Sequence, residues 1–201
     1  MLLSFTFFQS IDGFEQNLSG GAITDNGFGG VNLNSGTVSA QYAGLTEEVS
    51  HSSQEIDFRD RATIQFNARI LSGSGTPDYT VYLVAGDLSG NASIASPSCK
   101  GFGFKIIDDT LYAVSNFVGT CGSANEILSV ISNITVANMN VYRAVFTSGQ
   151  KIEFYVNEVL RITQNITTNS GQSNHLFELF VRNDGNQARL IVTFMSLIRD
   201  L

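Results

Sequence analysis

The chain of 201 residues has no tryptophan, two prolines and two cysteines, and only 14% of its residues are charged. An average soluble domain has about 25% charged residues, so this surface is poor in charge. The 11 basic and 18 acidic residues give a net charge of −7, and the basic residues form no run. Binding to nucleic acid is not expected, because neutralising phosphates requires clustered lysine and arginine.

Long hydrophobic runs are also missing, since no apolar stretch approaches the roughly 18 residues of a membrane-spanning helix. The first residues, Met1–Phe8, are apolar, but no basic residue precedes them and no small-residue cleavage site follows. Their alternation places Leu3, Phe5 and Phe7 on one side, which predicts a strand in place of a secretion signal. We therefore expect no signal peptide and no membrane insertion.

Alternation with a period of two is the main pattern of the sequence. Arg61–Ile70 alternates strictly, which predicts a strand with one buried and one wet face. Tyr79–Ala85 is apolar on both faces except at Thr80, so we expect it deep in a sheet. Ten to twelve short strands are expected, including Gly36–Tyr42, while Glu126–Ser132 fits either a helical turn or a strand. Regular turn signals between such strands are typical of an antiparallel sandwich or barrel.

Hairpins are predicted at two places. Phe102–Ile107 and Thr110–Phe117 flank a two-residue turn, so paired residues should have numbers that sum to 217. Val141–Thr147 and Lys151–Asn157 flank a three-residue loop that contains glycine. Further strands are expected at Val159–Thr163, Leu176–Val181 and Ala188–Ile198. With no linker and no convincing helical period, residues 1–201 are expected to form one all-β domain.

Two stretches resemble hairpins of a known fold. Gly101–Ile107 with Asp109–Val114 resembles a hairpin of concanavalin A-like jelly-roll domains, and Tyr142–Leu160 is similar to the laminin G-like signature. The resemblance implies a two-sheet antiparallel jelly roll, and the 15 phenylalanines predict a core rich in phenylalanine. One turn departs from the signature, because Asn157-Glu158 replaces Asn-Gly. A type I′ turn requires a positive φ that glutamate disfavours, so either the turn differs or neighbouring contacts hold it.

Jelly-roll domains with strands rich in Gly, Ser, Thr and Asn resemble those of phage and viral structural proteins. The resemblance implies a non-enzymatic virion protein, a capsid decoration or a head or tail fibre module, located on the particle surface. Its partners would be other virion proteins and copies of itself, because a weakly charged β-surface suits a homo-oligomer. The alternative is a lectin-like receptor-binding module that binds cell-surface glycans.

Ligand-binding candidates are residues at strand ends: Asp78, Tyr79, Asn116 and Phe117. The competing interpretation places Tyr79 and Phe117 in the ordinary core. A second alternative, a glycoside hydrolase, rests on Glu55-Ile56-Asp57, which resembles the catalytic strand of jelly-roll hydrolases with paired carboxylates. Asp60 stands where that family has glutamate, and the chain lacks the tryptophan of sugar clefts. We therefore expect no catalytic residue.

The two cysteines, Cys99 and Cys121, have numbers that sum to 220, so they lie near the open end of the first hairpin. A disulfide is predicted if the strand ends bend together, and the alternative is two free thiols in neighbouring loops. No cofactor is expected. The alternative is calcium, for which loop oxygens occur at Asp108-Asp109, Asp184-Gly185-Asn186 and Asp25-Asn26. Such residues more often cap turns.

Overall fold

The computed structural model describes residues 2–7, 14–25, 30–48, 56–57, 61–90, 99–118, 125–147, 150–166, 172–173 and 175–200. These residues form strands joined by turns, and every pair of neighbouring strands is antiparallel. In the described ranges, no helix is long and apolar enough to cross a membrane.

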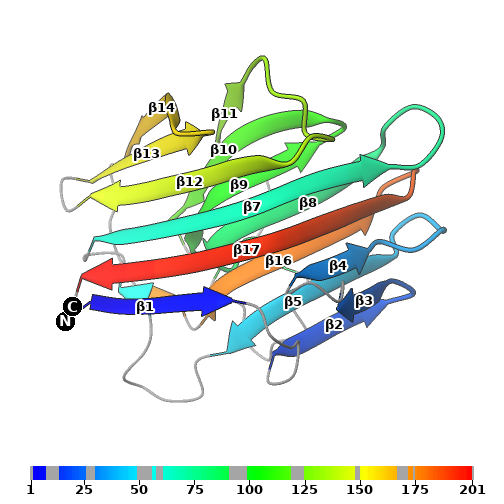
Figure 1. Cartoon of the computed structure of the whole chain (residues 1–201), viewed down its shortest axis with the longest axis horizontal. Helices are drawn as coiled ribbons and strands as arrows, with labels where there is room; N and C mark the ends of the chain where they lie inside the picture. The colour runs from blue at the N-terminus through cyan, green and yellow to red at the C-terminus, as the bar shows by residue number, and fades with distance from the viewer. Residues whose placement is uncertain are drawn as a thin grey trace.

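Two large sheets face each other and make up the sandwich (Figure 1). Sheet A has the order β14 (Val159–Asn165), β13 (Lys151–Val156), β12 (Asn140–Thr147), β7 (Ala62–Ser72), β17 (Ala188–Asp200), β4 (Val31–Asn34) and β3 (Ala22–Asp25), and β1 (Leu2–Phe7) also pairs with β17. Sheet B has the order β11 (Ile127–Ile131), β10 (Thr110–Asn116), β9 (Gly101–Ile107), β8 (Tyr79–Gly86), β16 (His175–Asn183), β5 (Tyr42–Glu48) and β2 (Glu15–Ser19). A separate small sheet pairs β6 (Ile56–Asp57) with β15 (Gln172–Ser173).

The alternation of the sequence predicts the longest strands well. Strand β7 alternates between buried and half-buried residues, and all eight residues of β8 are buried. The β9–β10 hairpin has the expected register, because Thr110 pairs with Ile107 and Leu111 with Ile106. Of the two alternatives for Glu126–Ser132, the structure has the strand, β11.

The predicted strand over Gly36–Tyr42 is wrong, because β4 ends at Asn34 and β5 begins only at Tyr42. Gly36 and Ala40 have φ values of 88° and 67°, which a strand does not contain. The side-chain oxygen of Gln41 accepts hydrogen bonds from the amides of Thr37 and Val38, at 2.9 and 3.0 Å. This local bonding satisfies the backbone within a turn.

The core between the sheets is rich in phenylalanine, as expected from the composition. Phe104 of β9 packs against Tyr142 of β12 and Phe154 of β13, with ring centroids 5.3 and 5.6 Å apart. The other buried core phenylalanines are Phe66, Phe102, Phe117, Phe146 and Phe177. Because these rings come from the inner faces of both sheets, they hold the two layers together.

The Asn157-Glu158 turn between β13 and β14 has a positive φ at both positions, 52° and 64°. Neighbouring contacts hold this conformation. The Asn157 amide donates to Asn140 at 2.9 Å, and its oxygen accepts the Val141 amide at 2.9 Å. The Glu158 carboxylate binds Arg143 at 2.9 Å. These bonds offset the roughly 1 kcal/mol that glutamate loses in a left-handed conformation.

Candidate functional site

The outer faces of the two sheets differ, and the outer face of sheet B is largely covered. Val84 and Phe180 point outward from sheet B, yet they are only 0% and 1% exposed. They form a second hydrophobic cluster with Tyr82, Val114 and Leu88, and Leu88 belongs to the segment that follows β8. A covered face offers little room to a large ligand.

Buried charges on this outer face of sheet B are paired within the protein. Lys105 and Glu126 form an ion pair at 2.6 Å, and the hydroxyl of Tyr82 donates to Glu126 at 2.7 Å. The Lys105 ammonium also lies 4.7 Å from the centre of the Tyr82 ring. Burial and the Glu126 carboxylate raise the pKa of Tyr82 well above its usual range. These groups bond to one another and leave few polar atoms for a ligand.

The outer face of sheet A is polar and half-exposed, in contrast. On β7 the outward residues include Gln65, Asn67 and Arg69, which are all half-buried. Arg143 of β12 lies opposite Gln65, and Tyr155 of β13 lies opposite Arg143. The rows of amide, guanidinium and phenol groups suit the hydrogen-bonding groups of a polar ligand.

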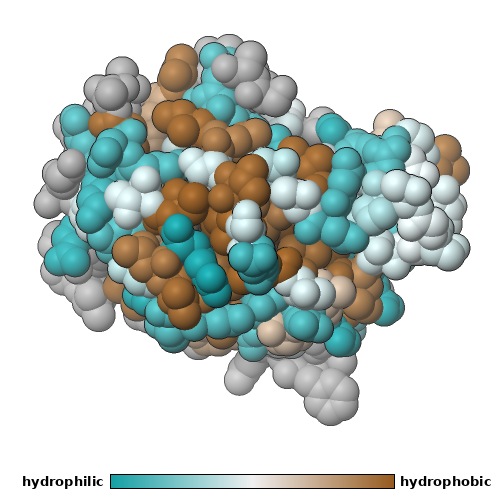
Figure 2. Space-filling model, turned by 90° about the horizontal axis from the view of Figure 1, so that it is seen from above, coloured by the Kyte–Doolittle hydropathy of each residue, from teal (hydrophilic) through white to brown (hydrophobic). Residues whose placement is uncertain are grey.

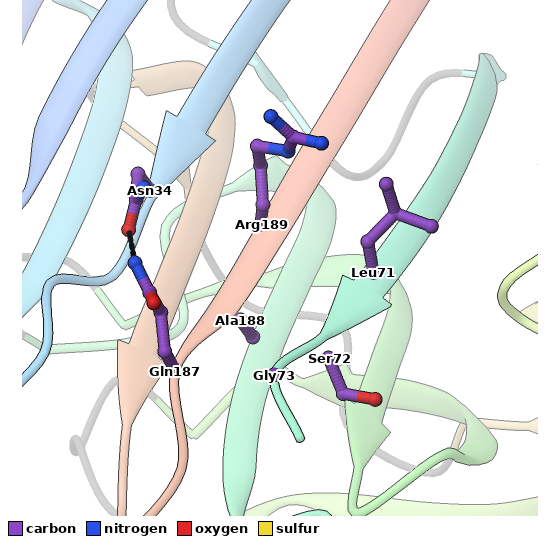
Figure 3. Close-up of a pocket in the computed structure, with 7 residues that line it drawn as sticks. All are labelled: Asn34, Leu71, Ser72, Gly73, Gln187, Ala188 and Arg189. Atoms are coloured by element: carbon purple, nitrogen blue, oxygen red, sulfur yellow. Dashed lines mark hydrogen bonds between the residues drawn. The ribbon is translucent and has the colours of Figure 1, made fainter.

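A pocket of about 220 Å³ opens at one end of this face, where β4 and β7 end and β17 begins. Arg189 of β17 pairs with Asn34 on one side and with Leu71 on the other. Figure 3 shows the Arg189 side chain rising between the Asn34–Gln187 pair and Leu71. The remaining lining residues are Ser72, Gly73 and Ala188.

Hydrogen bonds fix the polar groups of this pocket. Gln187 donates its side-chain amide to the Asn34 oxygen at 2.8 Å, and that oxygen also accepts the Gly36 amide at 3.0 Å. The amide of Gly73 donates to the Gln187 carbonyl at 2.7 Å. Among the described residues, none forms an ion pair or hydrogen bond with the Arg189 guanidinium. The pocket thus combines a fixed amide pair with an unpaired cation.

A second hollow of about 280 Å³ lies at the same end and shares Ser72 with the pocket. It is lined by Asp109 of the β9–β10 turn and by Ile134, Thr135, Val136 and Ala137. The two hollows flank the start of the β7–β8 loop, so this end carries both concave regions described here.

Asp78 and Tyr79, two of the predicted ligand residues, lie at this end of the sandwich. Asp78 is exposed, and its carbonyl accepts the amides of Asp184, Gly185 and Asn186 at 2.9–3.0 Å. Tyr79 is fully buried, and its hydroxyl donates to Asp109. Burial, and next the bond to Asp109, raise the pKa of Tyr79 far above its usual range. Tyr79 therefore occupies the core, and Asp78 ties two loops together.

Asn116 and Phe117, the other two predicted ligand residues, lie at the opposite end. Asn116 pairs with Gly101, whereas Tyr79 lies beside the β9–β10 turn. Asn116 and Phe117 are buried, 2% and 3% exposed, and the Asn116 side-chain oxygen accepts a hydrogen bond from the Val118 amide at 2.9 Å. The structure therefore does not bring the four predicted residues together.

The acidic residues considered for the hydrolase alternative fall largely outside the described residues. Asp57 lies in β6, which pairs only with β15 and belongs to neither large sheet among the described strands. Glu55 and Asp60 lie outside the described ranges. No group of three or more His, Cys, Asp or Glu residues that could hold a metal occurs in the described part of the chain.

The loop acids considered for calcium bind groups of the protein. Asp108 accepts the Tyr79 amide at 3.0 Å, and Asp184 accepts the Thr80 hydroxyl at 2.6 Å and pairs with Arg182. Cys99 is buried and disulfide-bonded. Cys121 lies outside the described residues.

Comparisons with known proteins give a fold and no closer relationship. No family model matches the chain, and no curated protein matches it. A structure of botulinum neurotoxin type C, whose cell entry depends on interaction with two ganglioside molecules, has a TM-score of 0.61 and 10% identity. The match covers 92% of this chain but 42% of the toxin chain.

Two further structures match over most of both chains. Alginate lyase A1-II′, of polysaccharide lyase family 7, has a TM-score of 0.60 and 12% identity, over 95% of this chain and 96% of the lyase. The carbohydrate recognition domain of Emp47p has a TM-score of 0.55 and 11% identity, over 94% and 90%. The fold is a concanavalin A-like jelly roll. Identities this low concern the fold alone, so the jelly roll names no activity.

Sequence reasoning missed the residues that line the pocket of this jelly roll. Asn34, Gln187 and Arg189 come from segments far apart in the sequence, and only the pairing of β17 with β4 brings them together. Arg69 lies outside the pocket on the same outer face. Its outward direction was predictable, because the alternation of Arg61–Ile70 places it on the wet face with Gln65 and Asn67.

Proposed function

We propose that this chain is a carbohydrate-binding module that holds sugar hydroxyl groups in the pocket of Asn34, Leu71, Gln187 and Arg189. The pocket itself carries the proposal. Amide and guanidinium groups donate and accept in fixed planes, which suits neighbouring hydroxyl groups of a sugar ring. Leu71 supplies an apolar wall for the C–H groups of the ring. The ganglioside-dependent toxin and the Emp47p carbohydrate recognition domain support the proposal, as jelly rolls linked to sugars.

We propose binding without cleavage. Hydrolysis by most glycoside hydrolases uses a carboxylic acid whose pKa is raised enough to donate a proton to the glycosidic oxygen. Glu153, on the outer face of sheet A, has the opposite shift. Hydrogen bonds from Lys151, at 2.5 Å, and from Tyr155, at 2.7 Å, hold its pKa below the usual range. Glu153 is therefore a poor proton donor.

A glycan array followed by calorimetric titration of the sugars that bind tests the module. Gln187→Ala should weaken the affinity about fivefold, because a neutral hydrogen bond contributes roughly 1 kcal/mol. Gln16→Ala is the matched control, since Gln16 is exposed on β2 of the other sheet. The sugar should be recovered intact after the titration. An array on which no sugar binds, or an equal loss of affinity in Gln187→Ala and Gln16→Ala, would refute the proposal.

A second candidate function, assembly through copies of the chain, is favoured by the apolar edge of the sandwich. β11 and β14 are the end strands of the two sheets, and no described strand pairs with their outer edges. Figure 2 shows apolar side chains gathered on the face seen from above, where these two strands lie. The apolar edge consists of Ile127, Leu128, Val130, Val159 and Leu160, which are 38–53% exposed.

We propose a second copy of this chain as the occupant of the apolar edge. β11 has the sequence Ile-Leu-Ser-Val-Ile, without the charge or proline that usually protects an edge strand from pairing. Two identical edges complement each other about a two-fold axis. A virion surface, the setting implied by the sequence resemblance, is part of this second proposal.

Analytical ultracentrifugation of the wild type and of Val130→Lys with Leu160→Lys tests the assembly. The wild type should associate, and the double variant should be monomeric, because two buried lysines at each contact would lack partners. Val38→Lys, at a position that is 60% exposed on a turn, should associate as the wild type does. A wild type that stays monomeric at high concentration would contradict the assembly.

A further inference from the structure

We infer that the outer face of sheet A binds an acidic polysaccharide along a diagonal path through Arg189, Arg69 and Arg143, named here the arginine path. The inference rests on the proposed sugar-binding pocket, because Arg189 lines that pocket and starts the path. It adds the chemical class of the sugar, a chain that carries carboxylate or sulfate groups.

The register of three neighbouring strands sets the course of the arginine path. Arg189 pairs with Leu71 and Arg69 pairs with Ile191, so the two arginines are diagonal neighbours on β17 and β7. Arg143 of β12 lies opposite Gln65, four residues before Arg69 on β7. With usual strand spacing and rise, the path from Arg189 to Arg143 spans about 22 Å. That length exceeds a single sugar ring and fits an oligosaccharide.

Unused hydrogen-bond donors point to an anionic ligand. The Nε atoms of Arg69 and Arg143 are buried and have no hydrogen-bond partner among the described residues. Buried donors of this kind normally have an acceptor, because an unsatisfied buried donor destabilises the fold. Within the same ranges, no carboxylate pairs with Arg69 or Arg189. Carboxylate and sulfate groups accept two parallel bonds from a guanidinium group, and a turn of each side chain that uncovers its Nε atom would let them satisfy these donors.

Contacts within the protein hold the far end of the arginine path. The Arg143 guanidinium lies 4.1 Å from the centre of the Tyr155 ring, and Glu158 binds its outer nitrogen at 2.9 Å. Stacking on a ring fixes the plane of the guanidinium group before a ligand binds. Gln65 and Asn67 point outward between the arginines, where their amides can bond to hydroxyl groups.

A polysaccharide suits this surface better than a nucleic acid does. The net charge of −7 repels any polyanion, so net charge does not decide between the two classes of ligand. Single-stranded nucleic acids need exposed aromatic rings for base stacking, and the Tyr155 ring is already stacked against the Arg143 guanidinium. An acidic polysaccharide, which carries hydroxyl groups beside its charged groups, matches three arginines separated by amides.

Calorimetric titration with an oligogalacturonate hexasaccharide and with a heparin hexasaccharide tests the path. Matched neutral probes are the fully methyl-esterified and the desulfated forms of the same sugars. At least one acidic probe should bind ten or more times more tightly than its neutral form. Its affinity should fall as salt is added, because exposed charges are screened.

Alanine variants locate the binding on the sheet. Arg69→Ala and Arg143→Ala should each weaken binding of the acidic probe about tenfold or more, since hydrogen bonds to charged groups are the stronger kind. Arg69→Lys should restore part of the affinity. Arg161→Ala, at an exposed arginine of β14, two strands from Arg143, should bind as the wild type does. Thermal unfolding of each variant confirms that the fold is kept.

The outcomes separate this inference from the proposed function. Equal affinity for acidic and neutral forms, or unchanged affinity in both arginine variants, would overturn the arginine path and leave the pocket as a neutral sugar site. Absence of binding to every sugar would overturn both proposals. Tighter binding of a single-stranded oligothymidylate than of any acidic sugar would also overturn the arginine path.

Discussion

Phe104→Ala is expected to lower the free energy of unfolding by about 3–5 kcal/mol, because the removed ring leaves a cavity in the core. Phe104 is fully buried on β9 of sheet B. Its ring meets Tyr142 and Phe154 of sheet A, so a single side chain joins the two layers. Urea unfolding followed by circular dichroism measures the loss.

Two control variants separate the cavity from the general effect of substitution. Phe104→Leu keeps most of the volume and should cost about 1 kcal/mol. Val38→Ala changes a side chain that is 60% exposed and should cost less than about 0.5 kcal/mol. A loss below 1 kcal/mol for Phe104→Ala would show that the ring cluster does not join the sheets.

Glu178→Ala is expected to cost about 2–4 kcal/mol, because it leaves buried donors without an acceptor. Glu178 of β16 is 1% exposed on the outer face of sheet B. Its carboxylate accepts the amides of Leu88 and Ser89 at 2.8 and 2.9 Å, and also the Ser89 hydroxyl. This single group therefore holds the segment after β8 onto the sheet.

The pH dependence of stability isolates the charge of Glu178. Burial, and to a smaller extent the nearby Asp87, raise the pKa of this carboxyl above its usual value of 4.5. Its stabilising contribution is therefore full below pH 4.5 and is lost as the pH rises through the raised pKa. Glu178→Gln keeps an acceptor and cannot titrate. Its stability should therefore fall less steeply than that of the wild type between pH 4.5 and the raised pKa. Equal slopes for wild type and Glu178→Gln in Tm measured against pH would disprove the assignment.

Strands were predictable where alternation and turn chemistry agree along the sequence. The β9–β10 register followed from a two-residue turn, and the outward residues of β7 followed from strict alternation. Gly36–Tyr42 failed, because the side chain of Gln41 bonds to the backbone and closes a turn that no periodic pattern reports. Local hydrogen bonds of this kind compete with strand formation.

The candidate site was not predictable from local patterns, because it depends on long-range pairing. Asn34 and Arg189 are neighbours only through the β4–β17 register. Of the four predicted ligand residues, three are buried and only Asp78 is exposed. The position of a residue at a predicted strand end does not determine whether its side chain points into the sandwich or out of it. That direction depends on the partner strands.

The position of β17 has a consequence for how the protein folds. β17 comes last in the chain, yet it lies in the middle of sheet A, between β7 and β4, and it also pairs with β1. During synthesis, β7 and β4 therefore have no partner between them until residues 188–200 have left the ribosome. Long-range pairing of this kind makes folding slow and leaves strand edges open to aggregation meanwhile.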